Sequence, residues 1–515
     1  MHGRFPKETP HNFLTPMPSG VGLIKFFAEI FSKSDRTLSL KGEYMNNQCI
    51  AAISTAFGKG GIAVIRISGE GAIEVAGKMF KPASKKELTE VGGGRAVYGK
   101  IYSEGKMIDD GIATVFRAPN SFTGEDTVEI SCHGGVLLTE RVLKTAFLCG
   151  AVQAQAGEFT QRAFLNGKID LSGAEAVIGL IEAESEEKLN LCASHAAGVL
   201  KRRTEEIYGR VLDLLSSVYV GLDYPEEDLE EVSDDDFRAA LVSISAELEK
   251  TASTYREGKA VAEGVKTVLL GKPNAGKSSL LNALLGENRA IVTDIPGTTR
   301  DVIEEKVNCG RIILRLADTA GIRQSGDAVE KIGIEKAMEK ARESELIIAV
   351  FDVSRPLDEE DEKLVSLIAG EMKAGKSVIA ALNKSDSEER FSESELLARF
   401  TAELGSENGF IKTVKISARD GIGVDDLKKA CESLFADGYT DYASVAVVCN
   451  ARQFSAVCAA KDAVGRALAA FDSGLGSDVC GMDLESALAA LGEIDGRSVS
   501  EEVTSSIFHN FCVGK

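Results

Sequence analysis

A glycine-bracketed loop between a strand pattern and a helix pattern constrains the fold of this chain more than any other feature. The segment, Val265 to Gly286, reads VKTVLLGKPNAGKSSLLNALLG. It contains the pattern G-x-x-x-x-G-K-[ST], in which backbone N–H groups at a helix N-terminus surround phosphate oxygens. We predict that Lys277 reaches the β- and γ-phosphates of a nucleotide and that Ser278 binds magnesium. Taken alone, the pattern also fits an ordinary strand-to-helix turn.

Three further motifs each follow a strand pattern, in the order typical of nucleotide hydrolases with such a loop. The first carries an Asp expected beside magnesium and a Gly expected to sense the γ-phosphate. The second and third are expected to contact the base of the nucleotide. Together with the phosphate loop they make four motifs in the expected order, which excludes a chance match. The runs and the motifs that follow them are 311–316 with Asp318, Thr319, Ala320 and Gly321; 377–382 with Asn383, Lys384, Ser385 and Asp386; and 411–416 with Ser417, Ala418 and Arg419.

The second motif indicates which base is bound. The carboxylate of Asp386 can accept hydrogen bonds from N1–H and the exocyclic amine of guanine. Adenine cannot offer these donors, so an adenine nucleotide would leave the carboxylate unpaired. The sequence therefore predicts a guanine nucleotide, with the backbone of 417–419 placed to contact the guanine carbonyl.

The segment 290–301, AIVTDIPGTTRD, is dense in Gly, Thr and Asp, and we expect it to sense the γ-phosphate. The hydroxyl of Thr299 or Thr298 would complete the coordination of magnesium and tie this segment to the triphosphate. Asn274, inside the phosphate loop, has two interpretations. Its amide oxygen could bind a monovalent cation beside the phosphates, or its side chain could cap the turn.

Hydrolysis also needs a group that positions water. Ras-like enzymes use a Gln directly after the Asp-x-x-Gly motif, whereas this chain has Ile322 there. Glu330 is the leading candidate for this role and Gln324 the second. The alternative for Glu330 is exposure without function on the helix expected at 329–340.

Length and composition limit the remaining possibilities. The 515 residues suggest about three domains, and the hydrophobic content of 44% supports globular packing. No apolar run approaches the ~20 residues that cross a bilayer. The ten cysteines are scattered without a C-x-x-C pair, which argues against zinc ribbons and disulfides and favours the cytoplasm.

The charge of the chain is strongly acidic. A net charge of −20 should repel nucleic acid, so an RNA partner would require a local basic patch. Much of the acid lies in Asp223–Asp236, DYPEEDLEEVSDDD. We expect a solvated loop between helices there rather than a metal site, because hard cations need a specific ligand geometry.

The order of patterns along the chain predicts several domains. Strand, glycine-turn and helix patterns after Cys49 indicate an α+β domain. Helix patterns at Glu184–Tyr219 and Phe237–Tyr255 precede the phosphate-loop unit, and another at Leu484–Leu491 follows it, so we predict an α/β domain inserted into a helical domain. The predicted divisions are 1–44, a disordered or mis-assigned extension; 45–165, α+β; 166–260, helical; 265–436, the inserted nucleotide-binding domain; and 437–515, helical with a terminal Cys-Val-Gly-Lys.

Several segments together closely resemble one family, the tRNA modification GTPases called MnmE or TrmE. They are GKPNAGKSS, TDIPGTTRD, DTAGIR, NKSD, the N-terminal GGIAVIRISG, the central GEFTQRAFLNGKIDL and the terminal FCVGK. The nucleotide motifs alone would admit relatives, but the other three segments are specific to this family. The resemblance covers Met45 to Lys515, and residues 1–44 have no counterpart in the family pattern.

The resemblance implies an N-terminal folate-binding domain that forms a homodimer, a helical domain, and an inserted Ras-like P-loop GTPase domain. It implies that GTP hydrolysis drives a conformational change during modification of the wobble uridine of tRNA. With an FAD-containing partner, MnmG (GidA), in a heterotetramer, the family adds an aminomethyl or carboxymethylaminomethyl group to carbon 5. A tetrahydrofolate such as 5-formyltetrahydrofolate is the implied one-carbon donor.

Matching positions give the expected site residues. For GTP they are Asn274, Ala275, Gly276, Lys277, Ser278 and Ser279; Thr293, Asp294, Ile295, Pro296, Gly297, Thr298 and Thr299; and the Asp318, Asn383 and Ser417 motifs given above. Magnesium falls on Ser278 and Thr299, potassium on Asn274, Thr293, Ile295 and Thr298, and folate on Arg66, Glu125, Lys168 and Lys515. Lys277, Glu330 and Cys512 are the expected catalytic residues.

The terminal cysteine and the function each have an alternative. An isolated cysteine is usually a buried hydrophobe, but Cys512 lies close to the carboxyl terminus, and Lys515 could favour its thiolate or anchor a folate carboxylate. We predict that Cys512 acts as a nucleophile or as an acid–base group. A lipid anchor of the C-a-a-X type fits less well because Lys515 is a poor final residue. A ribosome-assembly GTPase is the alternative function, although it would not need FCVGK or a folate domain.

Overall fold

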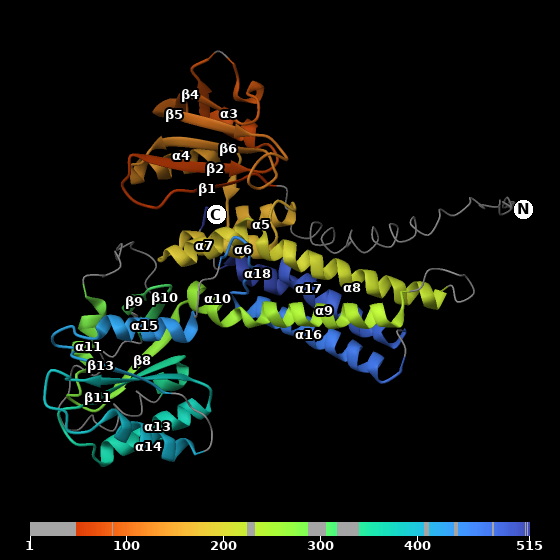
Figure 1. Ribbon diagram of the computed structural model, residues 1–515. Helices are drawn as coiled ribbons and strands as arrows, with labels where there is room; N and C mark the ends of the chain where they lie inside the picture. The colour runs from red at the N-terminus through yellow and green to blue at the C-terminus, as the bar shows by residue number, and fades with distance from the viewer. Residues whose placement is uncertain are drawn as a thin grey trace, which may run out of the picture. The chain divides into compact units, whose positions relative to one another are not determined.

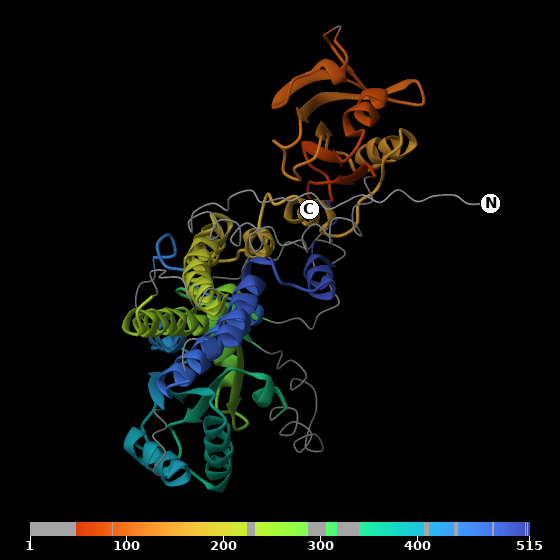
Figure 2. The same ribbon diagram turned by 90° about the vertical axis from the view of Figure 1, so that its right-hand side faces the viewer.

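The computed structural model describes residues 48–84, 86–223, 232–286, 305–316, 339–405, 411–436, 441–475 and 478–509, with Phe511, Val513 and Gly514. The chain divides into two compact units (Figure 1, Figure 2). The first unit comprises 1–168, 212–232 and 497–515, and the second unit comprises 169–211 and 233–496. Within the described ranges, no helix combines the length and the apolar content that crossing a membrane requires.

The first unit is built on a seven-stranded sheet with the order β3-β4-β5-β6-β2-β1-β7. Neighbouring strands are antiparallel except β1 and β7, which are parallel. The strands are β1 (Ile50–Ile53), β2 (Ile62–Ser68), β3 (Phe80–Pro82), β4 (Arg95–Ser103), β5 (Lys106–Phe116), β6 (Thr127–His133) and β7 (Val152–Gln153). The predicted α+β character of this part is confirmed.

Two helices, α3 (Ala72–Met79) and α4 (Val136–Leu148), pack on one face of this sheet. Alternation along β2 explains the arrangement, because Ile65 and Ile67 are buried in the core with these helices and Arg66 points to the other face. On that other face, Phe159 of α5 (Glu158–Leu165) packs against β1. Two further helical segments belong to this unit: α18 (Glu501–His509), which packs on α5, and the part of α8 (Val199–Asp223) from Leu212 onward.

The second unit contains a six-stranded sheet with the order β13-β12-β11-β8-β10-β9, parallel except for β9. Side chains of the fully buried β11 alternate between two cores, one with α11 and α15 and the other with α13 and α14. The strands are β8 (Val265–Gly271), β9 (Glu305–Cys309), β10 (Ile312–Leu316), β11 (Leu346–Asp352), β12 (Ser377–Asn383) and β13 (Lys412–Ile416). The helices are α11 (Lys277–Leu285), α13 (Glu359–Lys373), α14 (Glu393–Leu404) and α15 (Val424–Phe435).

Helices before and after this sheet in the chain pack together. α9 precedes the sheet and α16 follows it, and the rings of Phe237 and Phe471 lie 5.2 Å apart between them. The sheet is therefore inserted into a helical segment, as predicted. The helices are α6 (Leu171–Ile181), α7 (Glu186–Ala196), α8 (Val199–Asp223, which continues into the first unit), α9 (Asp234–Ser253), α10 (Tyr255–Ala262), α16 (Ala451–Asp472) and α17 (Gly481–Asp495).

Two local expectations were wrong. The helix expected over Glu184–Tyr219 is interrupted at Gly198, whose φ of +75° ends α7 before α8 begins. The acidic run expected as a loop is helical at both ends, because Asp223 ends α8 and Asp234 and Asp235 lie in the first turn of α9, where carboxylates interact favourably with the helix dipole. Residues 224–231 of this run lie outside the described part of the chain. Ser233 caps this helix by accepting a hydrogen bond from the amide of Asp236.

Candidate functional site

The phosphate loop joins the end of β8 to the start of α11, as the sequence predicts. Its glycines are required by close contacts. A Cβ at Gly276, where φ is +99°, would lie 2.1 Å from Nδ2 of Asn383, and a Cβ at Gly271 would lie 2.5 Å from the carbonyl oxygen of Val350. Asn274 has a positive φ of 60°, a conformation that Asn tolerates better than most residues. The side chains of Asn274 and Ser278 are exposed and therefore accessible to a ligand.

The ammonium group of Lys277 lies across this loop. Its Nζ donates to the carbonyl oxygens of Gly271 at 2.7 Å and Lys272 at 2.8 Å. Burial lowers the pKa of Lys277 because the charged form loses hydration. An anion beside Nζ would restore that lost stabilisation, which suits the phosphate-binding role predicted for this lysine.

Asn383 connects three of the four predicted motifs. Its Nδ2 donates to the carbonyl oxygen of Ala275 in the phosphate loop at 2.8 Å. Its Oδ1 accepts from the amide of Ala418 at 2.9 Å. The side chain is 2% exposed, so both hydrogen bonds are made in the interior. Asn383 therefore fixes the phosphate loop and the loop at 417–419 to the strand end that carries the base-specifying motif.

The base-specifying motif is held by a second carboxylate. Lys384 has a φ of +66°, and its Nζ donates to Oδ2 of Asp352 at 2.6 Å. Burial opposes ionisation of Asp352, but hydrogen bonds from Lys384 and Ser354 outweigh it and lower the pKa of Asp352. Asp352, at the end of β11, thus holds Lys384 of the predicted base-specifying motif in place, a contact that was not foreseen from the sequence.

Asp386 is exposed at the end of this motif, so its carboxylate is accessible to a ligand. Hydrogen bonding from Ser417 lowers the pKa of Asp386, so its carboxylate is ionised at neutral pH and acts only as an acceptor. The Ser417 hydroxyl also lies 2.9 Å from Oδ2 of Asp420. Because the Ser417 hydroxyl carries one proton, it donates a hydrogen bond to either Asp386 or Asp420 at any one time.

Lys272 is a second residue that the sequence analysis missed. It lies in the phosphate loop, is 7% exposed, and its Nζ contacts Asp358 and lies 3.2 Å from Oδ2 of Asp361. These two aspartates form a capping box at the start of α13. The buried ammonium group of Lys272 pairs with the buried Asp361 and with the more exposed Asp358, and these contacts anchor the loop to this helix. The signal in the sequence was the pattern Asp358-x-x-Asp361, which marks a helix start but does not reveal the lysine that binds it.

Part of the predicted site lies outside the described residues. This holds for the switch residues Thr293, Asp294, Ile295, Pro296, Gly297, Thr298 and Thr299, for Asp318, Thr319, Ala320 and Gly321, for Gln324 and Glu330, and for Cys512 and Lys515. The roles predicted for these residues stay predictions.

Three of the predicted folate residues lie near one another in the first unit. Arg66 pairs with Glu129 at 2.8 Å across β2 and β6. Glu125 accepts from Ser68, two residues along β2 from Arg66, at 3.1 Å. Lys168 packs over Gly124, where a Cβ would lie 3.2 Å from its Cγ, and its Nζ donates to the carbonyl oxygen of Pro119 at 2.9 Å.

An arginine and two aromatic rings complete this region. Arg162, 8% exposed, donates to Glu125 and Glu158 and is the residue that holds Glu125 in place. The rings of Phe122 and Phe159 lie 5.2 and 5.5 Å from the guanidinium carbon of Arg66. The region therefore combines cations, a carboxylate and aromatic faces, the groups that a flat polar ring with an acidic tail requires.

The end of the chain reaches this same sheet. Val513 forms an antiparallel bridge with Ala156, and the carbonyl oxygen of Gly514 accepts from the hydroxyl of Ser54 at 3.0 Å. Ser54 follows directly after β1, in which Ala52 pairs with Arg66. The residues that flank Cys512 therefore lie beside the strand next to the predicted folate residues.

Comparison with known proteins decides the family. Residues 49–168 match the model of the GTP-binding protein TrmE N-terminus, and residues 171–512 match that of the MnmE helical domain. The tRNA modification GTPase MnmE of Clostridioides difficile is 42% identical over 466 residues, which cover 90% of this chain and 99% of the relative. The corresponding protein of Geobacillus kaustophilus is 42% identical over 469 residues, with the same coverage. This chain belongs to the MnmE family of tRNA modification GTPases.

Two solved structures resemble part of this chain. Era of Aquifex aeolicus, bound to GDP and aluminium fluoride, is 23% identical and covers 39% of this chain and 66% of its own, with a TM-score of 0.24. The G domain of the FeoB iron transporter of T. maritima is 28% identical and covers 33% of this chain and 98% of its own, with a TM-score of 0.22. The MnmE assignment depends on the full-length relatives and not on these structures.

MnmE membership confirms the predicted family, the predicted fold class and the prediction of a GTP hydrolase. The individual site residues, the domain boundaries and the identity of any folate or potassium ligand stay predictions.

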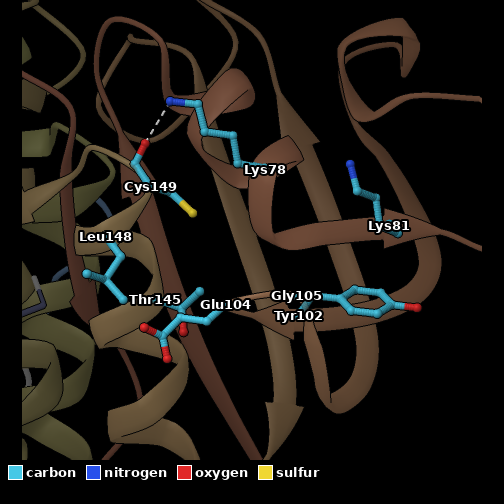
Figure 3. A pocket seen from close by; sticks show the side chains of 8 residues that line it. All are labelled: Lys78, Lys81, Tyr102, Glu104, Gly105, Thr145, Leu148 and Cys149. Atoms are coloured by element: carbon cyan, nitrogen blue, oxygen red, sulfur yellow. Dashed lines mark hydrogen bonds between the residues drawn. The ribbon is translucent and has the colours of Figure 1, made fainter.

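A pocket of about 590 Å³ in the first unit lies apart from both groups of predicted site residues (Figure 3). Its lining includes Lys78, Lys81, Tyr102, Thr145 and Cys149. Both ammonium groups have structural partners, since Lys78 donates to the carbonyl oxygen of Cys149 at 2.9 Å and Lys81 to that of Gly77 at 3.2 Å. Cations at helix C-termini are stabilising, so these lysines are explained as caps of α4 and α3.

Proposed function

We propose that this chain hydrolyses GTP in order to modify the wobble uridine of certain tRNAs. With the FAD-containing partner MnmG (GidA), in a heterotetramer in the cytoplasm, it adds an aminomethyl or carboxymethylaminomethyl group to carbon 5. The observation that carries the proposal is the link made by Asn383, which joins the phosphate loop, the base-specifying motif and the loop at 417–419. That link supports a guanine-nucleotide site, and the chain aligns over 90% of its length with an MnmE relative.

In this proposal the loop and the first turn of α11 bind the phosphates. Backbone N–H groups at the helix start and the ammonium of Lys277 meet the negative oxygens. The exposed hydroxyl of Ser278 fits a magnesium ligand, with Thr299 as its proposed companion. Magnesium, when bound, neutralises charge on the phosphate oxygens. Asp386 selects guanine, and Glu330 is the proposed group that orients water in place of the Gln of Ras-like enzymes.

Potassium is the proposed further cofactor, held by Asn274 with Thr293, Ile295 and Thr298. The exposure of the Asn274 side chain supports this role, because it leaves the amide oxygen accessible to a cation, whereas the positive φ of Asn274 fits either interpretation. A cation there would stabilise negative charge that develops during phosphoryl transfer, as an arginine finger does in other GTPases.

GTP hydrolysis should therefore be faster in potassium than in sodium, because the larger ion can bridge Asn274 and phosphate oxygens. We expect a rise in kcat of at least about tenfold, equivalent to about 1.4 kcal/mol in the barrier. Steady-state rates in matched potassium and sodium chloride test this, and Asn274→Ala should remove the difference. Equal rates in both salts, or dependence on one switch arginine instead, would contradict the proposal.

The first unit is the proposed site for a tetrahydrofolate such as 5-formyltetrahydrofolate. Arg66, Lys168 and Lys515 would meet the acidic tail, and Glu125 would accept hydrogen bonds from the pterin. Because Arg162 and Ser68 both bond Glu125, the carboxylate is held in a fixed position. The Phe122 ring beside Arg66 would offer an aromatic face.

The uncovered part of the same sheet supports the proposed homodimer. Ile62, Tyr98 and Ile112 are 67%, 56% and 46% exposed, and the register of β4, β5, β6 and β2 places them on the face opposite α3 and α4. Large apolar side chains gathered on one exposed face are typical of an interaction surface. A second copy of this unit is the proposed occupant.

Nucleoside analysis of bulk tRNA from a strain that lacks this gene tests the function. We expect the modified wobble uridine to disappear and to return when the gene is restored. Normal tRNA nucleosides together with accumulated ribosomal precursors would instead favour the alternative, a ribosome-assembly GTPase. A Lys277→Ala copy serves as a control, since it should not restore the nucleoside.

A further inference from the structure

The hairpin formed by β9 and β10 has a special position in the second unit. In the sequence it lies between the two predicted switch segments, and β10 ends at Leu316, two residues before Asp318. β10 pairs with β9 on one side and with β8, the strand that leads into the phosphate loop, on the other. A displacement of this hairpin would therefore move the residue predicted to lie beside magnesium.

The turn of the hairpin is bonded to a helix outside the sheet. The guanidinium of Arg311 contacts the carboxylate of Glu257 on α10 and lies 3.2 Å from the hydroxyl of Tyr442. That hydroxyl lies 3.4 Å from the same carboxylate, so the three groups form a closed triangle. The side chains of Arg311 and Glu257 are 16% and 19% exposed. An ion pair that is largely removed from water is weakly screened and sensitive to geometry.

Backbone contacts fix the same turn. The amide of Arg311 donates to Oε1 of Glu432 on α15 at 3.0 Å. Gly310, with a φ of +65°, allows this approach, because a Cβ there would lie 2.5 Å from Oε2 of Glu432. Glu432 thus holds the turn through the backbone amide of Arg311, and Glu257 holds it through the Arg311 side chain.

The hairpin has two more contacts with the helical part of the unit. Nζ of Lys306 on β9 lies 2.7 Å from Oε1 of Glu184, between α6 and α7. Arg315 on β10 donates to the carbonyl oxygen of Glu263, just after α10, at 3.4 Å. Both strands of the hairpin therefore contact helical segments.

The segment that carries Tyr442 is bonded to α7 and α9. Ser194 donates to the carbonyl oxygen of Tyr442, and Nε2 of His195 hydrogen-bonds that of Val447 at 2.8 Å. The amide of Val448 donates to Thr254 at the end of α9 at 2.9 Å. A continuous series of contacts thus leads from β10 to three helices.

We infer that Arg311 is a positioning residue that couples the nucleotide site to the helical segment through the contacts of the β9–β10 hairpin with α10 and Tyr442. The inference rests on the proposed GTPase function. A change at the nucleotide site upon exchange of GTP for GDP is carried along β10, a short strand paired with β8 and β9, to the ion pair at the turn of the hairpin. By reciprocity, a partner that moves α10 changes the nucleotide site.

Hydrogen exchange of the full-length chain tests this coupling. In the wild type, amides of α10 should exchange at different rates with GDP and with a non-hydrolysable GTP analogue. In Arg311→Gln this difference should be lost, kcat should fall about tenfold, and GTP affinity should stay within about twofold because no group that binds nucleotide is changed. Arg311→Lys keeps the charge and should restore part of the difference and of kcat.

Arg256→Gln is the matched control. Arg256 also joins α10 to the six-stranded sheet and its helices, through a hydrogen bond of 2.9 Å to Ser377 on β12 and through the ring of Phe435 on α15. Within the described residues it makes no hydrogen bond to the hairpin. It should leave the nucleotide-dependent difference in place. If Arg311→Gln does not fold, Glu257→Gln and Tyr442→Phe remove the same triangle more gently.

Each outcome decides the question. If the difference in α10 amide exchange between GDP and the GTP analogue persists in Arg311→Gln, the inference is overturned and the residue has a purely structural role. This includes the case in which the exchange rates rise equally with both nucleotides. A wild-type chain that binds GTP but has equal exchange in both states overturns it as well. Failure of the wild type to bind GTP would instead contradict the proposed function.

Discussion

Replacing Asp386 with Asn should lower the affinity for GTP by at least about 100-fold and give the chain a preference for xanthosine triphosphate. The carboxylate of Asp386 is ionised, and in the proposed site it would accept hydrogen bonds from guanine. The amide of Asn would present a donor to the guanine amine and leave donors unpaired, a costly arrangement in a binding site. Xanthine carries an oxygen in place of that amine and would accept from the new amide.

Competition of GTP and xanthosine triphosphate for a labelled nucleotide measures this change in preference. Asp420→Asn is the matched control, because Asp420 bonds the same serine, Ser417, but is not part of the base-specifying motif. The control should bind GTP within about twofold of the wild type. Unchanged GTP affinity in Asp386→Asn would reject the assignment of this residue to the base.

The elements around the nucleotide site were predictable because their signals are local. The run VKTVLLG is apolar and bounded by glycine, and the predicted strand matches β8, Val265–Gly271. The leucine-rich pattern after Lys277 gives α11. The insertion of the sheet was also predictable, since helix patterns with the same periodicity lie on both sides of it.

Interactions between distant residues were not predictable from the same patterns. Asn383 was expected to bind nucleotide, but nothing in its local sequence indicates that its two amide atoms reach Ala275 and Ala418. The binding of Lys272 to Asp358 and Asp361 joins residues 86 and 89 positions apart. Such contacts depend on which strands become neighbours, and strand order is a property of the whole sheet.

The errors in the helical region have a different origin. A helical pattern continues through Gly198 because the apolar side chains on either side keep their spacing, yet a single residue with positive φ ends α7. The run of aspartates before Phe237 resembles a solvated loop in composition. Their positions in the first turn of α9, after the Ser233 cap, are what make the same charges favourable in a helix.

The net charge also gave a misleading indication about an RNA partner. A net charge of −20 argues against RNA, whereas the chain belongs to a family of tRNA modification GTPases. Net charge is a sum over the surface, and screening within about 10 Å makes binding depend on local patches. Total charge therefore describes solubility and long-range steering better than it describes the partner that a site accepts.

The second large effect is expected at Cys512. Cys512→Ser should lower tRNA modification by at least about 100-fold, the range in which loss of an acid–base or nucleophilic group falls, while GTP hydrolysis stays within about twofold. Thiols elsewhere in the described chain are poor candidates for such chemistry. Burial raises the pKa of Cys49 and Cys132 to about 11 and that of Cys309 to about 12, so these side chains are neutral and unreactive at physiological pH.

The neighbours of Cys512 explain why it should differ. Val513 bridges to Ala156, and Gly514 bonds to Ser54 beside the strand that pairs with Arg66. Val513 and Gly514 therefore lie beside the strand next to the residues proposed to bind folate. Lys515 would then supply the positive charge that favours a thiolate or holds a folate carboxylate.

Modified nucleosides made in a reconstituted reaction, measured beside phosphate release from GTP, test the role of Cys512. Cys458→Ser is the control, since Cys458 is partly exposed and belongs to α16, which carries none of the residues proposed to bind folate. Its modification activity should remain within about twofold of the wild type. If Cys512→Ser modifies tRNA as well as Cys458→Ser does, the terminal cysteine serves packing alone. If both activities fall together in Cys512→Ser, the tail acts on GTP turnover and the separate chemical role proposed for it is wrong.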